Sequence, residues 1–112
     1  MIPVEIRTEI SGFDSKGRKR VVTKDNDITI FSVNGDYFAS SSKCPHKGGP
    51  LFLARILTEN RIMCPSHHII FNLKNGQVIS NPIPETMGEY SKCENLKIFK
   101  VWIEKTELRI TD

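Results

Sequence analysis

Hydrophobic and polar residues alternate with a period of two along most of the chain. The first alternating segment covers residues 4–10, where charged side chains occupy one face and the other face carries Val4, Ile6, Thr8 and Ile10. A period of two is typical of a strand with one buried face. We therefore predict that the chain begins with a half-buried strand.

Further short strands are predicted by the same pattern, separated by turn residues. They cover residues 18–22, 28–33, 37–39, 56–57, 61–63, 71–73, 77–79, 97–103 and 107–110. Asn-Gly pairs at 34–35 and 75–76 are strong hairpin signals. Many short strands with frequent turns are typical of an all-β sandwich or barrel. Residues 85–96 are polar and unpatterned, and we expect a long loop there with one helical turn at most.

The length and composition indicate a single folded domain. The chain has 112 residues, of which 38% are hydrophobic and 26% are charged, and both fractions are ordinary for a globular protein. No apolar run approaches the length of a membrane span, and residues 1–5 lack the pattern of a secretory signal. We therefore expect one domain over residues 1–112 and a cytoplasmic monomer. The net charge of +3 is too small to indicate nucleic-acid binding.

Cysteine and histidine residues gather in one part of the chain. All three histidines lie between positions 46 and 68, and Cys44 and Cys64 stand beside them. The third cysteine, Cys93, makes the number odd, which argues against a disulfide framework in a chain without an export signal. A metal or redox role for some of these cysteines is the better hypothesis.

The candidate ligands form two short clips, each with one thiolate and one imidazole. Cys44 and His46 are separated by one residue, and Cys64 and His67 by two. Zinc accepts two cysteines and two histidines, but its usual clips space cysteines by two to four residues and histidines by three to five. A [2Fe–2S] cluster needs four ligands on two irons, which two mixed clips supply. A Cys–His nucleophile pair is weaker, because nothing else in the chain suggests an orienting group.

Residues 44–51 and 64–76 resemble the two cluster-binding boxes of Rieske-type ferredoxins. The flanking segments agree with this resemblance. Residues 30–39 are similar to the hairpin that leads into the first box, residues 82–84 to the proline loop that covers the cluster, and residues 97–110 to the closing hairpin. The resemblance therefore covers most of the chain.

The resemblance implies both a fold and a ligand set. The fold would consist of stacked antiparallel sheets with a small cluster-binding subdomain inserted at approximately residues 43–84. One [2Fe–2S] cluster would be bound, with Cys44 and Cys64 on the buried iron and His46 and His67 on the outer iron. Of the remaining candidates, we expect His68 to be a surface side chain and Cys93 an ordinary free thiol.

Departures from the respiratory members of that family predict a low reduction potential. Those relatives carry a disulfide over the cluster, but the matching positions here are Gly49 and Ser66. They also place hydroxyl donors near the cluster sulfurs, where this chain has Ile69 and Phe71. Donors to sulfur stabilise the reduced state, so their loss lowers the potential. We expect the lower half of the Rieske range, which spans about −150 to +300 mV.

The function predicted from these observations is that of a soluble one-electron carrier without catalysis of its own. Its partners would be redox proteins, a reductase and an acceptor. One alternative is a dedicated ferredoxin component or small subunit of a multicomponent oxygenase or reductase, and another is a structural zinc-binding module. A terminal oxygenase would need a further iron site with two histidines and a carboxylate, and only His68 remains for it.

Overall fold

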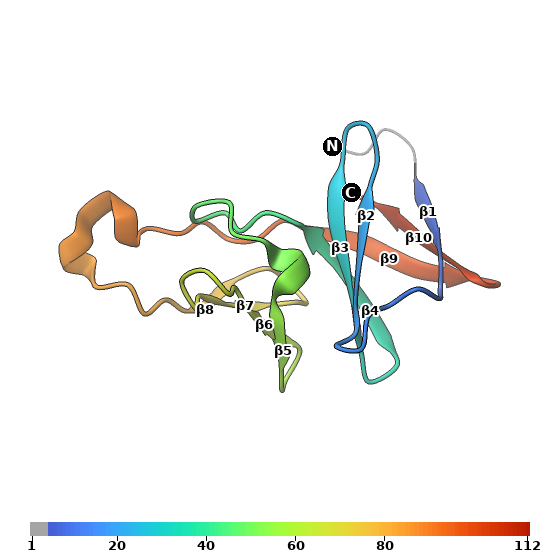
Figure 1. Cartoon of the computed structure of the whole chain (residues 1–112), viewed down its shortest axis with the longest axis horizontal. Helices are drawn as coiled ribbons and strands as arrows, with labels where there is room; N and C mark the ends of the chain where they lie inside the picture. The colour runs from blue at the N-terminus through green and yellow to red at the C-terminus, as the bar shows by residue number, and fades with distance from the viewer. Residues whose placement is uncertain (1–4) are drawn as a thin grey trace.

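The computed structural model describes residues 5–112, so Val4, at the start of the first predicted strand, lies outside the described residues. The molecule is elongated, with principal extents of 49 × 29 × 20 Å. A larger sheet forms one end, and a smaller sheet and a covering loop extend toward the other (Figure 1).

The larger sheet has six antiparallel strands in the order β1-β10-β9-β4-β3-β2. They are β1 (Ile6–Glu9), β2 (Arg18–Val22), β3 (Asp27–Val33), β4 (Asp36–Ser41), β9 (Ile98–Glu104) and β10 (Glu107–Thr111). Only two residue pairs, Ala39 with Phe99 and Ser40 with Ile98, join β4 to β9. The sheet therefore consists of two three-stranded halves whose inner faces share one hydrophobic core. This arrangement confirms the predicted all-β class with stacked antiparallel sheets.

The smaller sheet is inserted between β4 and β9 and has the order β5-β6-β7-β8. Its strands are β5 (Arg55–Leu57), β6 (Arg61–Met63), β7 (Ile70–Asn72) and β8 (Val78–Ser80). Two 3₁₀ helices accompany it, η1 (Leu51–Leu53) and η2 (Glu85–Ser91). The segment expected to be a loop with one helical turn is thus two short 3₁₀ turns, with a kink at Gly88 where φ is +61°.

The two Asn-Gly pairs form different turns. Asn34 and Gly35 both have positive φ, 51° and 87°, and they join β3 directly to β4 as a two-residue hairpin turn. The second predicted hairpin is wider, because β7 ends at Asn72 and β8 begins only at Val78. The reason is Leu73, which leaves the strand to bury its side chain and donates its N–H to the carbonyl of Asn60 at 2.8 Å.

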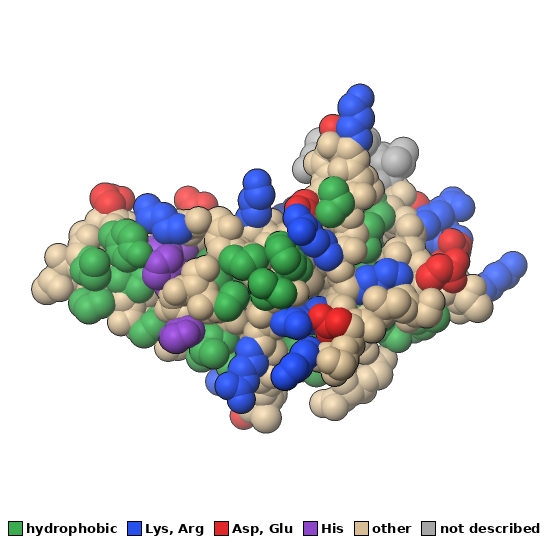
Figure 2. Space-filling view, in the orientation of Figure 1, with side chains coloured by type: hydrophobic (Ala, Val, Ile, Leu, Met, Phe, Trp, Pro, Cys, Tyr) green, Lys and Arg blue, Asp and Glu red, His purple; other side chains and the backbone are tan. Residues whose placement is uncertain are grey.

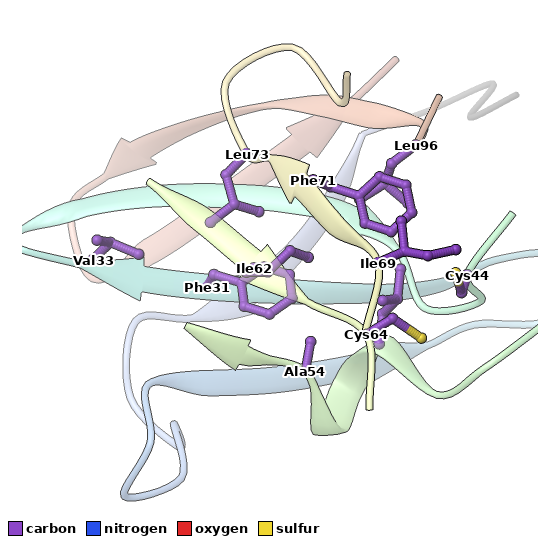
Figure 3. Close-up of a cluster of buried hydrophobic side chains, with 11 residues drawn as sticks. Phe31, Val33, Cys44, Ala54, Ile62, Cys64, Ile69, Phe71, Leu73 and Leu96 are labelled. Atoms are coloured by element: carbon purple, nitrogen blue, oxygen red, sulfur yellow. The ribbon is translucent and has the colours of Figure 1, made fainter. Parts of the chain in front are cut away.

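A second hydrophobic core lies under the smaller sheet and connects it to the larger one. Phe31 and Val33 of β3 contribute to this core, together with Ile62 of β6 and Phe71 of β7. Figure 3 shows the core side chains and the sulfur atoms of the two buried cysteines at its edge. The part of the chain with the candidate ligands is therefore packed onto the large sheet by a shared core.

Gly76 offers a test of this packing, because its φ is +78° and a Cβ atom there would run into the carbonyl oxygen of Leu96. We expect Gly76→Ala to lower the free energy of unfolding by at least about 3 kcal/mol, through backbone strain and collision together. Gly35 is the matched control, since its φ is +87° but no atom lies within 4 Å of its Cβ position. Gly35→Ala should cost only about 1 to 2 kcal/mol. Equal losses of unfolding free energy in the two variants, measured by thermal or urea unfolding, would contradict the close contact of Gly76 with Leu96.

Candidate metal centre

The first clip forms a tight turn that returns to its own starting residue. The N–H of Gly48 donates to the carbonyl of Cys44 at 2.8 Å, and the N–H of Cys44 donates to the carbonyl of Gly49 at 2.8 Å. Gly48 adopts φ of +73°, in the left-handed region that favours glycine. The left-handed conformation within this turn therefore accounts for the glycine at position 48.

The second clip repeats this turn with the same hydrogen bonds. The N–H of His68 donates to the carbonyl of Cys64 at 2.9 Å, and the N–H of Cys64 donates to the carbonyl of Ile69 at 2.9 Å. His68 stands at the position equivalent to Gly48 and also has positive φ, 60°. Two segments far apart in the sequence thus present one cysteine each at the start of matching turns.

The two cysteines meet in the interior, where Cys44 is 3% exposed and Cys64 is fully buried. A hydrogen bond from the Cys44 thiol lowers the pKa of Cys64 to about 6. The same contact, together with burial, raises the pKa of Cys44 far above its ordinary value. Opposite pKa shifts of this kind are expected when two ionisable groups share a hydrogen bond in a buried site.

Backbone N–H groups are directed at both sulfurs. The N–H of His46 approaches Cys44, and the N–H groups of Ser66 and His67 approach Cys64, where they lower its pKa. The Ser66 hydroxyl also donates to Cys64, a contact that the sequence analysis missed. Donors of this kind stabilise negative charge on a thiolate, the form that binds metals.

The two imidazoles form a second pair. The Nδ1 atoms of His46 and His67 are 3.3 Å apart, and their rings are nearly perpendicular at 82°. Two nitrogens bound at about 2.1 Å to one tetrahedral metal ion would lie about 3.4 Å apart, so this spacing suits a single metal between them. His46 is 8% exposed and His67 is half-buried. Figure 2 shows histidine side chains reaching the surface beside hydrophobic ones, away from the large sheet.

The outer ring nitrogens both meet Tyr90 of η2. The Nε2 atom of His46 contacts the carbonyl oxygen of Tyr90, and the Nε2 atom of His67 lies 2.6 Å from the Tyr90 hydroxyl. The sequence analysis missed this residue, because it lies in a polar segment with no ligand spacing. An aromatic residue in an otherwise polar loop was the one available signal.

The structure also places the remaining candidates. His68 is exposed. Cys93 packs against the core that contains both cysteines, its thiol contacts Cys44, and burial raises its pKa. Long-range packing brings Cys93 to this position, so no local sequence pattern could have predicted it.

Gly49 lies close to Ser66 and Cys64. A Cβ atom on Gly49 would lie 2.7 Å from the Ser66 Oγ and 2.9 Å from the Cys64 Sγ.

The donor atoms are thus grouped by chemistry, sulfur with sulfur and nitrogen with nitrogen. Among residues 5–112, no three cysteine, histidine or carboxylate side chains gather as they would around one ion. No helix in this described part is long and apolar enough to cross a membrane. An all-β fold with one buried thiol pair and one imidazole pair fits the class of iron–sulfur proteins with mixed ligands.

Comparisons with known proteins agree with that class. Residues 4–100 match the model of the Rieske [2Fe-2S] domain. The chain is 32% identical over 83 residues to apoptosis-inducing factor 3 of Mus musculus, covering 74% of this chain but only 12% of that protein. It is 28% identical over 83 residues to the biphenyl dioxygenase ferredoxin subunit of Pseudomonas sp. (strain KKS102), covering 74% of this chain and 68% of the subunit.

Among solved structures, the ferredoxin of carbazole 1,9a-dioxygenase from Nocardioides aromaticivorans IC177 has the same fold. The TM-score is 0.78 at 15% identity, over 96% of this chain and 97% of that one. The chain belongs to the Rieske [2Fe–2S] domain family and carries one [2Fe–2S] cluster.

The contact of Gly49 with Ser66 and Cys64 can be tested by adding one methyl group. Gly49→Ala should displace the Cys64 sulfur and lower the iron and sulfide bound per protein at least twofold. Gly48→Ala is the control, because Gly48 has positive φ but no atom within 4 Å of its Cβ position. It should cost about 1 to 2 kcal/mol of stability and leave the iron content unchanged. Full iron content in Gly49→Ala would contradict the close approach.

Proposed function

We propose that the chain is a one-electron carrier whose [2Fe–2S] cluster is held by four residues, Cys44, Cys64, His46 and His67. One observation carries this assignment, the pairing of Nδ1 with Nδ1 at 3.3 Å beside a buried pair of thiols. A cluster with two thiolates on one iron and two imidazoles on the other needs that grouping. A structural zinc ion would need all four donors around one point.

The bound cluster supplies the chemistry, which is the uptake and release of one electron. The chain's own residues hold the thiolates in the dry interior and place the imidazoles near the surface. Backbone N–H groups of Ser66 and His67 face the Cys64 sulfur, so the additional negative charge of the reduced state meets fixed dipoles. A rigid, largely buried setting limits the rearrangement that accompanies each transfer.

The potential is proposed to lie in the lower half of the Rieske range. Ile69 and Phe71 are fully buried and carry no hydroxyl. Gly49 faces Ser66 at the positions where the respiratory relatives have their disulfide, and these two residues cannot form one. The hydroxyl of Ser66, which donates to Cys64, offsets part of this loss of donors.

For the physiological setting, we propose a dedicated ferredoxin component that carries electrons from a reductase to an oxygenase. Similarity to the biphenyl dioxygenase ferredoxin subunit, over 68% of that subunit, supports this setting. We further propose one domain over residues 1–112, with residues 43–84 carrying the ligands, and a monomer. Three free cysteines suit a reducing compartment, and we propose the cytosol.

Neighbouring histidines allow a sharp test of the ligand set. His67→Ala should abolish the visible absorption of the oxidised protein and the EPR signal of the reduced one, because one iron loses a ligand. His68→Gly is the matched control, since His68 is exposed and its φ of +60° suits glycine. It should retain both signals at full intensity. Loss of the cluster in His68→Gly with retention in His67→Ala would overturn the assignment.

The midpoint potential tests the low-potential proposal directly. Voltammetry of the purified protein at pH 7 should give a value in the lower half of the range from about −150 to +300 mV. The physical reason is the absence of hydroxyl donors at Ile69 and Phe71. A midpoint above about +150 mV would contradict the proposal.

A further inference from the structure

Tyr90 contacts both predicted histidine ligands through two different oxygen atoms. Its backbone carbonyl contacts the Nε2 atom of His46, and its hydroxyl lies 2.6 Å from the Nε2 atom of His67. Its ring stands nearly perpendicular to both imidazoles, at 83° and 88°, with centroids 5.2 and 5.5 Å away. One residue therefore covers the outer edge of the whole imidazole pair.

The protonation of the two rings follows from these contacts. A neutral imidazole has one N–H and one lone pair. Since the two Nδ1 atoms face each other at 3.3 Å, a metal between them takes both lone pairs, and each Nε2 then carries the hydrogen. The carbonyl oxygen of Tyr90 accepts from His46, and the hydroxyl oxygen of Tyr90 accepts from His67. Ligating histidines generally donate their other N–H in this way, which fixes ring orientation and strengthens the metal bond.

We propose that Tyr90 is a positioning residue that orients both histidine ligands and tunes the reduction potential of the cluster. This inference rests on the ligand assignment proposed above. An acceptor at Nε2 makes an imidazole a better electron donor to iron, which favours the oxidised state. Removing the hydroxyl therefore raises the potential. The effect is moderate, because Tyr90 is 38% exposed and water can take the place of its hydroxyl oxygen.

The position of Tyr90 depends on Asn81 rather than on burial. No residue of η2 is buried, so the segment has no hydrophobic anchor of its own. The side chain of Asn81 connects the two ends of the segment between Ile83 and Ser91. Its Oδ1 accepts from the N–H of Ile83 at 3.1 Å, and its Nδ2 donates to the carbonyl of Ser91 at 2.6 Å. Ser91 directly follows Tyr90, so this bond fixes the backbone carbonyl that His46 meets.

Tyr90→Phe is the main test, with Tyr37→Phe as the matched control. These are the two tyrosines of the chain, and Tyr37 packs against Phe13 in the large sheet, with ring centroids 5.6 Å apart. Tyr90→Phe keeps the ring and the backbone carbonyl, so the cluster should remain bound. We expect the reduction equilibrium to shift at least threefold toward the reduced state, a rise of about 28 mV for one electron. Tyr37→Phe should have the wild-type potential.

Pulsed EPR of the reduced protein with ¹⁵N-labelled histidine gives a second readout. The couplings of the two outer nitrogens report their hydrogen bonds. In Tyr90→Phe, only the His67 nitrogen should change, because the contact of His46 is to the backbone. In Asn81→Ala, which frees the segment, both outer nitrogens should change. This difference between one and two altered nitrogens is not expected from a general loss of stability.

The outcomes separate this inference from the proposed function. Wild-type potential and wild-type nitrogen couplings in Tyr90→Phe, with the cluster spectrum intact, would overturn the role of Tyr90 and leave the electron carrier in place. An equal shift in Tyr37→Phe would overturn it as well. Absence of cluster signals from the wild-type protein would instead overturn the proposed function. If Tyr90→Phe loses its cluster, the potential and couplings of Asn81→Ala decide, and unchanged values there overturn the inference.

Discussion

The meeting of two buried thiols is the constraint on which the rest of the structure depends. Cys44 and Cys64 come from separate loops, and both sulfurs lie at the edge of one hydrophobic core. Each loop closes on its own cysteine through a pair of backbone hydrogen bonds, so the direction of each sulfur is set locally. Their approach is set by the core, which includes Phe31 of the large sheet. Local turns and long-range packing are both needed to place the pair.

Such a pair is electrostatically unfavourable until a metal is present. Two thiolates in a dry site would repel each other, and the hydrogen bond between the two groups raises the pKa of Cys44 and lowers that of Cys64, so that only one of them readily loses its proton. In the proposed ligand set, iron bound by both sulfurs would offset this cost with its positive charge. Because cysteine ligands must be deprotonated to bind, cluster binding at the proposed ligands would be linked to the folding of the two loops. The backbone N–H groups near both sulfurs reduce the same cost before any metal arrives.

The sequence predicted the features that depend on neighbouring residues. Period-two alternation located the strands, and Asn34-Gly35 located a two-residue turn, because both signals act within a few positions. Clip spacing indicated which cysteines and histidines belong together. It did not show Leu73 leaving its strand, Cys93 packing beside Cys44, or Tyr90 reaching the histidines. These contacts join distant segments through tertiary packing, and no short pattern in a single sequence encodes them.

The two ends of the site therefore have different physical roles. At the sulfur end, burial and backbone dipoles fix the charge that the site can hold. At the imidazole end, the donors lie near the surface under a segment with no buried residue. For the electron carrier proposed above, the shortest protein path to a partner lies at that second end, since the thiol end is enclosed by the core. The two oxygen atoms of Tyr90 lie at this same end, so the residue proposed to tune the imidazoles also lies where the proposed partner would approach. Tuning and access are consequently coupled through one exposed residue.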